Sequence, residues 1–217
     1  MGIRVGHIAF YAGPHTEGAP DNLEAVIVDF INQSKKRLEI AVQELESLPI
    51  AQAIIAARQR RVLVKLVIEQ SYLKRSPPKT DPWTPGGQNE VNRAVHDAIL
   101  RSHIDVKVDY NVGIFHQKFI VRDREAVLTG STNFTATGTH RNLNHVVIVD
   151  DPGVATLYAK EFAEIQRGHF GRLNEGHDPH SKVSVISDVS IKVLFAPDHN
   201  PEMEIMKQMM KARERNA

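Results

Sequence analysis

Apolar positions along this chain follow two spacings, one typical of strands and one typical of helices. Short runs of consecutive apolar residues indicate buried strands, and apolar residues that return every three or four positions indicate one face of a helix. The runs predict strands at residues 7–12, 37–42, 62–69, 104–108, 119–121, 126–128 and 144–149. The helical spacing predicts helices at residues 23–31, 50–60, 89–101 and 152–168. This alternation predicts an α/β fold, with a mixed β-sheet and helices on both faces.

Three stretches follow neither spacing. Residues 71–88 contain four prolines and two glycines and predict a long loop, which is either a substrate-recognition element or a disordered insertion. Residues 135–141 are also expected to form a loop. Residues 169–182 carry three histidines at irregular spacing among glycines and prolines, and we interpret them as a linker rather than a metal site.

The C-terminal end repeats a pattern from the N-terminal end. An apolar strand at 191–195 ends in Ala-Pro-Asp-His and leads to a Met-rich amphipathic helix, just as the strand at 8–12 ends in Gly-Pro-His and leads to a helix. We therefore predict one domain over residues 1–185 and the start of a second, truncated repeat over residues 186–217. The alternative is a packing helix that completes the first domain.

Composition narrows the class of protein. The 217 residues are 41% hydrophobic and 24% charged, with a formal net charge of +1 and no cysteine. This is enough apolar sequence for one core, whereas no strongly basic field indicates a nucleic-acid partner and no thiolate can bind a metal. Because no apolar run approaches the ~18 residues of a membrane-spanning helix and no signal peptide is apparent, we expect no transmembrane segment and a cytoplasmic location.

The stretch from residue 114 to 133 concentrates the candidate chemistry. It contains His116, Lys118 and Asp123 in the spacing H-x-K-x4-D, followed by Gly-Ser-Thr-Asn at residues 130–133. Two short apolar runs on either side of a polar turn predict a β-hairpin. Side chains two apart on a strand share a face, and the exit of the second strand of a hairpin lies beside the entry of the first.

This hairpin predicts one polar patch. It holds the imidazole of His116, the ammonium of Lys118, the hydroxyl of Ser131 and the carboxamide of Asn133. Neutral imidazole is a nucleophile near neutral pH, and the other three groups can hold the non-bridging oxygens of a phosphate diester. The carboxylate of Asp123 is expected to orient a histidine or to pair with a lysine. A histidine and a lysine on a strand are more often plain surface residues, but the combined spacing favours chemistry.

The segments HQKFIVRD and LTGSTNFT resemble the motifs of the phospholipase D superfamily. The resemblance implies a covalent phosphohistidine mechanism without a metal or other cofactor. It also implies that two such motifs form one active site, either within one chain or across a homodimer. The matched positions are the motif histidine His116, the phosphate-binding lysine Lys118, the motif aspartate Asp123 and the downstream phosphate-contacting pair Ser131 and Asn133.

Residues 142–145 depart from the family pattern. Several members, nucleases among them, carry Asn-x-Glu-Asn a little beyond the second motif segment, and here Asn144 takes the place of the glutamate. The role of that glutamate in orienting the motif histidine therefore does not carry over from the resemblance.

We accordingly expect a phosphodiesterase of phospholipase D type, which hydrolyses or transfers a phosphodiester of a phospholipid or a nucleic acid. Its second motif would come from the missing remainder of a longer chain or from a homodimer partner. Two alternatives stay open: an incomplete, non-catalytic half that binds phosphate, and a nuclease that acts on DNA or RNA as a homodimer. The net charge of +1 slightly disfavours the nuclease.

Overall fold

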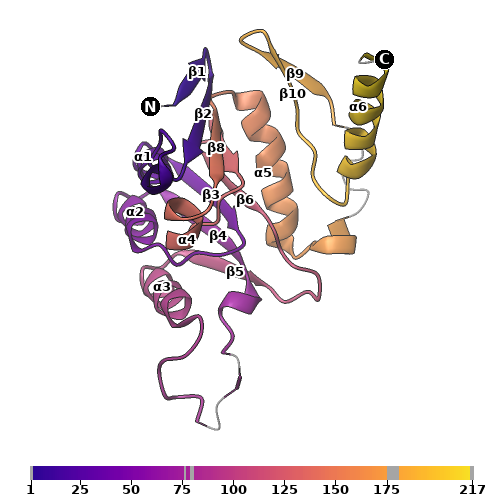
Figure 1. The fold of residues 1–217 in the computed structure, drawn as a ribbon. Coiled ribbons are helices and arrows are strands. Elements are labelled where there is room, and N and C mark those ends of the chain that lie inside the picture. The colour runs from indigo at the N-terminus through magenta and orange to yellow at the C-terminus, as the bar shows by residue number, and fades with distance from the viewer. Residues whose placement is uncertain (1, 76, 79–80, 175–180, 216–217) are drawn as a thin grey trace.

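A computed structural model of the chain describes residues 2–75, 77–78, 81–174 and 181–215. Eight strands form one mixed sheet in the order β1-β2-β8-β7-β6-β3-β4-β5, and β9 pairs with β10 in a separate hairpin (Figure 1). The predicted α/β fold, with a mixed sheet covered on both faces, is confirmed. The strands are β1 Ile3–Val5, β2 Ile8–Gly13, β3 Arg37–Val42, β4 Leu63–Glu69, β5 Asp105–Asp109, β6 Lys118–Arg122, β7 Ala126–Gly130, β8 Asn144–Val149, β9 Val183–Ile186 and β10 Val189–Lys192. The helices are α1 Leu23–Asn32, α2 Leu48–Gln59, α3 Glu90–Arg101, α4 Ala136–His140, α5 Pro152–Arg167 and α6 Pro201–Arg215, with short 3-10 turns η1 His15–Glu17, η2 Gln70–Tyr72 and η3 Gly171–Asn174.

The directions of the strands bring the ends of seven strands to one edge of the sheet. β3, β4 and β5 are parallel, whereas β6 is antiparallel to β3, β7 to β6, β8 to β7 and β2 to β8. The carboxyl ends of β2, β3, β4, β5 and β7 therefore meet the amino ends of β6 and β8. We call this the site edge, because the loops that leave it carry the motif residues.

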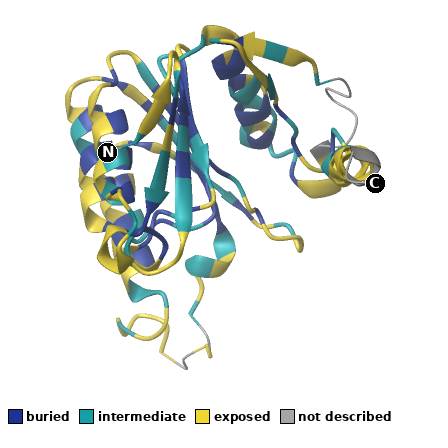
Figure 2. Ribbon diagram, turned by 45° about the horizontal axis from the view of Figure 1, so that its top comes forward, coloured by how far each residue is buried: buried dark blue, intermediate teal, exposed yellow. Residues whose placement is uncertain are grey.

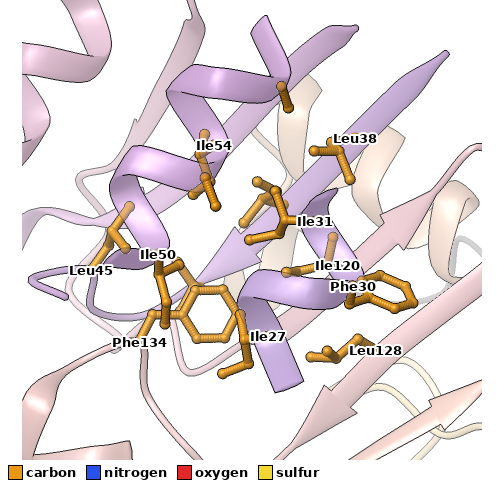
Figure 3. Packing of buried hydrophobic residues seen from close by; sticks show 14 of the residues in the cluster. Ile27, Phe30, Ile31, Leu38, Leu45, Ile50, Ile54, Ile120, Leu128 and Phe134 are labelled. Carbon is orange, nitrogen blue, oxygen red and sulfur yellow. The ribbon is translucent and has the colours of Figure 1, made fainter. Parts of the chain in front are cut away.

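One apolar core lies between the sheet and helices α1, α2 and α3. Figure 3 shows Phe30 and Ile31 of α1 and Ile54 of α2 directed at β3 and β6, and burying each such side chain contributes roughly 1.5–3 kcal/mol. These helices begin at ordinary caps, since the side chains of Asn22 and Ser47 accept hydrogen bonds from the backbone of the first turns of α1 and α2.

A second core lies on the opposite face, under α5. Phe162 of α5 and Phe119 of β6 are fully buried there, and Phe195 of the C-terminal segment joins them. The ring of Tyr158 lies edge-on to both Phe119 and Phe195, at centroid distances of 5.1 and 5.0 Å. The segment that precedes α6 therefore packs into the core of the main domain, whose burial pattern is drawn in Figure 2.

The structure departs from the sequence prediction at several connections. The loop expected at 135–141 is wrong, because α4 forms there with Thr135 as its cap, the Thr135 side chain accepting from the Gly138 N–H. β1 and the β9–β10 hairpin were not predicted, and the strand expected at 191–195 ends at Lys192. In the expected linker, His169 follows α5, while His177 and His180 lie outside the described residues.

Helix α6 exposes its apolar residues. They are Met203, Ile205, Met206, Met209 and Met210. The helix is tied to β10 by an ion pair between Lys192 and Glu204 at 3.0 Å. The start of a second repeat over residues 186–217 stays a prediction. Among the described residues, no helix is long and apolar enough to cross a bilayer.

Candidate active site

Four predicted site residues lie at the site edge. His116 is exposed in the loop that enters β6, and Lys118 is the first residue of that strand. Ser131 and Asn133 follow the end of β7, which pairs with β6 through the register Phe119↔Thr129. Neighbouring strands lie about 4.8 Å apart, so the exit of β7 runs beside the entry of β6, as the hairpin predicted.

Lys118 is buried, and its ammonium is held in place. Nζ donates to Gln43 Oε1 at 2.9 Å and to the His116 carbonyl at 3.1 Å. An ammonium has three N–H donors, so these two acceptors leave one for a bound oxygen. Burial lowers the pKa of Lys118 to about 8, although the negative charge of Glu44 opposes this shift. The negative charge of a bound anion would stabilise the protonated form of this buried ammonium.

His116 is poised as a neutral imidazole. Partial burial lowers its pKa below the ordinary 6.5, and the nearby positive charge of Lys118 lowers it further. The lone pair needed for nucleophilic attack is therefore available at neutral pH. An exposed imidazole therefore lies close to a buried cation at the site edge.

Carboxylates fix the loops around these two residues. Glu69, at the end of β4, accepts from the Phe115 N–H at 2.8 Å through Oε2, and from the Ser71 N–H and hydroxyl through Oε1. It therefore anchors the chain immediately before His116. Glu44, after β3, accepts from Asn92 Nδ2 at 3.4 Å, and burial raises its pKa despite that hydrogen bond.

Ser131 lies in a network with the start of β8. Its hydroxyl donates to Asn144 Oδ1 at 2.8 Å and lies 3.2 Å from His145 Nδ1. Asn144 Nδ2 in turn donates to the Gly138 carbonyl at 2.8 Å, which fixes the orientation of the amide. The residue in the place of the family glutamate thus orients Ser131.

The chain after Ser131 crosses to the end of β3. The Phe134 N–H donates to the Glu44 carbonyl at 3.1 Å, and the Phe134 carbonyl accepts from the Glu46 and Ser47 N–H groups. This crossing places Asn133 next to the segment that holds Lys118. Within the described residues, Asn133 Oδ1 is buried without a hydrogen-bond partner. The group of this carboxamide that can donate to a phosphate oxygen is Nδ2, because Oδ1 is only an acceptor.

Asp123 lies at the other end of β6, away from the other four. Six residues lie between it and His116, five of them in β6, which corresponds to about 20 Å of extended chain. Its carboxylate accepts from the N–H groups of Lys35, Lys36 and Arg37, at 2.9, 2.7 and 2.8 Å. The expected pairing with a histidine or lysine side chain is replaced by this backbone cradle. Burial alone would raise the pKa of Asp123, but the three backbone donors lower it overall.

This geometry predicts a structural role for Asp123. Asp123→Asn should lower the free energy of unfolding by about 1–3 kcal/mol, because a charge-assisted acceptor of three N–H groups becomes a neutral amide. The loss should appear above pH 3.8, the ordinary pKa, and disappear as pH falls through the lowered pKa, because the carboxylate is then protonated in both states. Denaturant unfolding at several pH values measures it.

The matched control for this change is Asp188→Asn. Asp188 also has a left-handed backbone in a hairpin turn, with φ of 64° against 55° at Asp123, and asparagine tolerates that conformation equally. It should leave stability unchanged. If Asp123→Asn kept full stability but lost turnover, the carboxylate would act in the chemistry instead.

A cavity of about 340 Å³ opens beside His116 on the α5 face. Its walls include Phe115 and Phe170, whose rings meet edge-to-face at 5.7 Å, together with Phe195 of the C-terminal segment. Buried Asp109 also lines it, and burial raises the pKa of that carboxyl. The volume is that of a small-molecule site.

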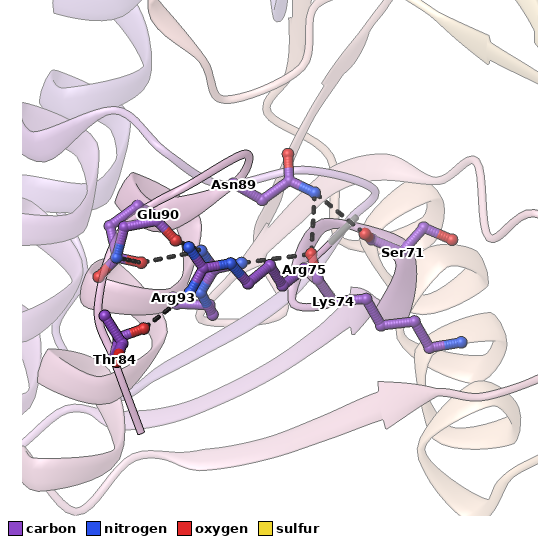
Figure 4. A network of polar contacts seen from close by, with 8 residues as sticks. Ser71, Lys74, Arg75, Thr84, Asn89, Glu90 and Arg93 are labelled. Atoms are coloured by element: carbon purple, nitrogen blue, oxygen red, sulfur yellow. Dashed lines mark hydrogen bonds and ion pairs between the residues drawn. The ribbon is translucent and has the colours of Figure 1, made fainter. Parts of the chain in front are cut away.

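The loop predicted at 71–88 has an ordered base, which Figure 4 shows. Arg93 of α3 donates to the carbonyls of Lys74 and Gly86, each at 3.2 Å, and pairs with Glu90 at 2.8 Å. Asn89 Nδ2 reaches the carbonyls of Ser71 and Lys74. These contacts join the two ends of the loop. Both interpretations of the loop, a substrate-recognition element and a disordered insertion, stay predictions.

A cluster of three acidic residues outside the motif could hold a cation. In the part of the chain that the structure describes, Glu161, Glu164 and Asp198 bring carboxylate oxygens within 4.8 Å of one another, between α5 and the C-terminal segment. The group does not include the motif residues.

Gln43 and Glu44 were missed from the sequence, although Gln43 holds the Lys118 ammonium. The available signal was their position. Polar residues that directly follow a buried strand gather at the carboxyl edge of a sheet, where α/β proteins bind ligands.

A family model and several known proteins are similar to this chain. The family model described as cardiolipin synthase, PLD-like domain, matches residues 27–166. A phospholipase D of Rickettsia felis is 29% identical over 143 residues, which cover 66% of this chain and 64% of that protein. A mitochondrial cardiolipin hydrolase of Xenopus laevis is 29% identical over 166 residues, which cover 76% of this chain and 66% of that protein. The chain thus spans just under two thirds of the length of these relatives.

Solved structures share the fold. Nuc from Salmonella typhimurium, described as a phospholipase D family member, superposes with a TM-score of 0.59 at 24% identity, over 74% of this chain and 93% of that one. Phosphatidylserine synthase of Haemophilus influenzae superposes with a TM-score of 0.53 at 13% identity, over 95% of this chain and 46% of that one.

Proposed function

Because this chain belongs to the phospholipase D superfamily through its PLD-like domain, we propose that it is a phosphodiesterase that works through a phosphohistidine intermediate. The observation that carries the proposal is the exposed, neutral imidazole of His116 beside the buried ammonium of Lys118. A nucleophile and a fixed positive charge at one point suit attack on an anionic diester.

In the first step, the lone pair of His116 attacks phosphorus. A P–N bond forms, and the bond between phosphorus and the leaving alcohol oxygen breaks. Lys118 offers its remaining N–H to a non-bridging oxygen, where charge concentrates in the transition state. Asn133 can offer its carboxamide to another oxygen. The Ser131 hydroxyl, which donates to Asn144 Oδ1 at 2.8 Å, must turn from that acceptor to donate to substrate.

The reaction also needs a group that donates a proton to the leaving oxygen in the first step. In the second step the same group accepts a proton from water, and the water then attacks phosphorus and breaks the P–N bond. Three nearby histidines have other partners. His140 Nε2 lies 3.2 Å from Glu24, and the ring of His145 stacks on Phe10 at 5.7 Å. His169 lines the same cavity as His116, but it too has a partner within the protein. We therefore assign this task to a histidine of a second motif outside this chain.

Two sources for the second motif remain in the proposal. The first is the remainder of a longer chain, with residues 186–217 as the start of its second repeat. The match of 95% of this chain to 46% of the Haemophilus phosphatidylserine synthase supports this source. The second is a homodimer in which two site edges face each other across a symmetric interface.

Turnover of bis(p-nitrophenyl) phosphate, measured together with particle mass by light scattering, tests the proposal. We expect hydrolysis by a dimer, or by this chain after the second half of such an enzyme is supplied, and weak or no hydrolysis by the monomer. A fully active monomer would reject the need for a second motif. Absence of hydrolysis in every assembled form would leave a phosphate-binding half and reject the phosphodiesterase.

Chelation should leave activity intact, because Lys118 supplies the charge that faces the phosphate. The nearby carboxylates are engaged: Glu69 by the Phe115 and Ser71 donors, and Glu44 by Asn92. We expect the same rate with and without EDTA in the turnover-competent form. Loss of activity in EDTA and its return with a divalent ion would indicate a metal-dependent phosphodiesterase instead.

A further inference from the structure

The loop that leads from β5 to β6 exposes three large apolar side chains. Tyr110, Val112 and Ile114 are 73%, 103% and 61% exposed. Single exposed apolar residues are ordinary, but three within residues 110–114 form an apolar tip directly before His116. We call these residues the docking loop. In Figure 1 the chain between β5 and β6 runs outward from the sheet.

The base of the docking loop is fixed, so its tip is held away from the core. The Asn111 N–H donates to Asp109 at 2.7 Å, and Asn111 Nδ2 donates to the Phe170 carbonyl at 3.1 Å. At the other end, the buried Phe115 N–H donates to Glu69. These bonds hold the loop at both ends, while the apolar side chains of Tyr110, Val112 and Ile114 stay exposed. Ile114 also lines the cavity beside His116.

Cations flank the apolar tip. Lys107 and Arg167 line one surface hollow together with Tyr110, and Arg172 lies in η3, two residues after the Phe170 that anchors the loop. Among the described residues, none of these three cations forms an ion pair. Asp105 lines the same hollow, but it lies 3.9 Å from Lys65 and accepts from Gln166 at 3.0 Å. The surface beside the loop therefore carries net positive charge.

We propose that the docking loop and these cations bind the end of the site edge at β5, the outermost strand of the sheet, to an anionic lipid surface. Aliphatic and tyrosine side chains enter the headgroup boundary, while lysine and arginine attract anionic lipids from the water side. Because His116 follows the loop directly, this contact would bring the imidazole to the phosphodiester of a membrane lipid. The inference rests on the proposed function and narrows its substrate to phospholipid.

Two other partners for the docking loop, a second copy of the chain and a nucleic acid, match its charges or its apolar side chains less well. A second copy packed symmetrically through this loop would bring Lys107, Arg167 and Arg172 toward the same cations of its partner, which disfavours that contact. A nucleic acid would use the cations, but the exposed side chains of Val112 and Ile114 match neither phosphates nor base edges.

Vesicle flotation tests this docking without requiring turnover. The probes are phosphatidylcholine vesicles with and without about one third phosphatidylglycerol, which sets the surface charge. Wild-type protein should float with the anionic vesicles and less with the neutral ones. Tyr110→Ser/Val112→Ser should reduce the bound fraction at least about tenfold, because the apolar contact is lost. Val5→Ser/Leu63→Ser is the matched control, since both residues are exposed at the opposite end of the sheet, and it should bind as wild type does.

Each result separates the docking from the chemistry. If Tyr110→Ser/Val112→Ser binds anionic vesicles as wild type does, the proposal that the docking loop contacts the lipid surface is wrong. The proposed membrane contact is also wrong if wild-type protein does not bind vesicles. In that case, loss of dimerisation in the variant would identify a second copy as the partner, and loss of oligonucleotide binding would identify a nucleic acid. Hydrolysis of soluble bis(p-nitrophenyl) phosphate should be equal in wild type and variant, so a failure of the proposed function would appear there while vesicle binding persisted.

Discussion

His116→Ala is expected to reduce turnover by about 10⁴-fold or more in any competent form of the protein, because it removes the nucleophile and with it the covalent route. The fold should survive. His116 is exposed, and its backbone carbonyl, which accepts from Lys118 Nζ, remains in the variant. Steady-state hydrolysis and thermal unfolding of the same sample measure both effects.

His7→Ala provides the control for this substitution. His7 is another exposed histidine, in the turn between β1 and β2 at the opposite end of the sheet, so its loss should change neither property. Added imidazole should restore part of the activity of the His116 variant by entering the vacated space. If His116→Ala kept wild-type turnover, a different residue would have to be the nucleophile.

Lys118→Met should cost about 3 kcal/mol of transition-state stabilisation, which is roughly a hundredfold in rate, because it removes the cation that meets the phosphate oxygens. Ser131→Ala and Asn133→Ala should each cost less, since a neutral donor forms a weaker hydrogen bond than a charged one. Equal losses from all three variants would contradict this ranking. The comparison is made as kcat/KM on one diester.

The same lysine predicts a pH signature in stability. Its folded-state pKa of about 8 lies below the ordinary 10.5, so the unfolded chain binds more protons between these values. The free energy of unfolding should therefore rise with pH from 8 to 10.5, by about 1–2 kcal/mol after allowance for solvent screening. Lys118→Met should lack this rise. Activity should move oppositely and fall above pH 8, because the neutral amine cannot hold the phosphate.

The sequence predicted the neighbourhood of His116, Lys118, Ser131 and Asn133 because strand alternation and hairpin pairing are local rules. The same rules, carried further, would have excluded Asp123. An extended strand separates it from His116, so a spacing of seven residues cannot close a contact. A motif groups residues by their order in the chain, while the sheet decides which of them meet.

Contacts between distant segments were harder to predict. Gln43 holds Lys118 across β3 and β6, and that pairing depends on the strand order, which no local pattern fixes. The Thr-rich segment at 135–141 has weak helix propensity, so α4 depends on the Thr135 cap and on contacts with α1. Phe195 lies in the segment predicted to start a second repeat, over residues 186–217, and its packing under α5 could not be read from that pattern.

The most direct test of the account is to trap the intermediate on His116. A turnover-competent form would be mixed with a phosphodiester in EDTA and quenched in alkali, where a P–N bond survives, and its peptides would be weighed by mass spectrometry. We predict a phosphoryl adduct on the peptide that contains His116, and no such adduct in His116→Ala. An adduct on another residue, or sustained turnover with His116 unmodified at every time of quenching, would contradict the account.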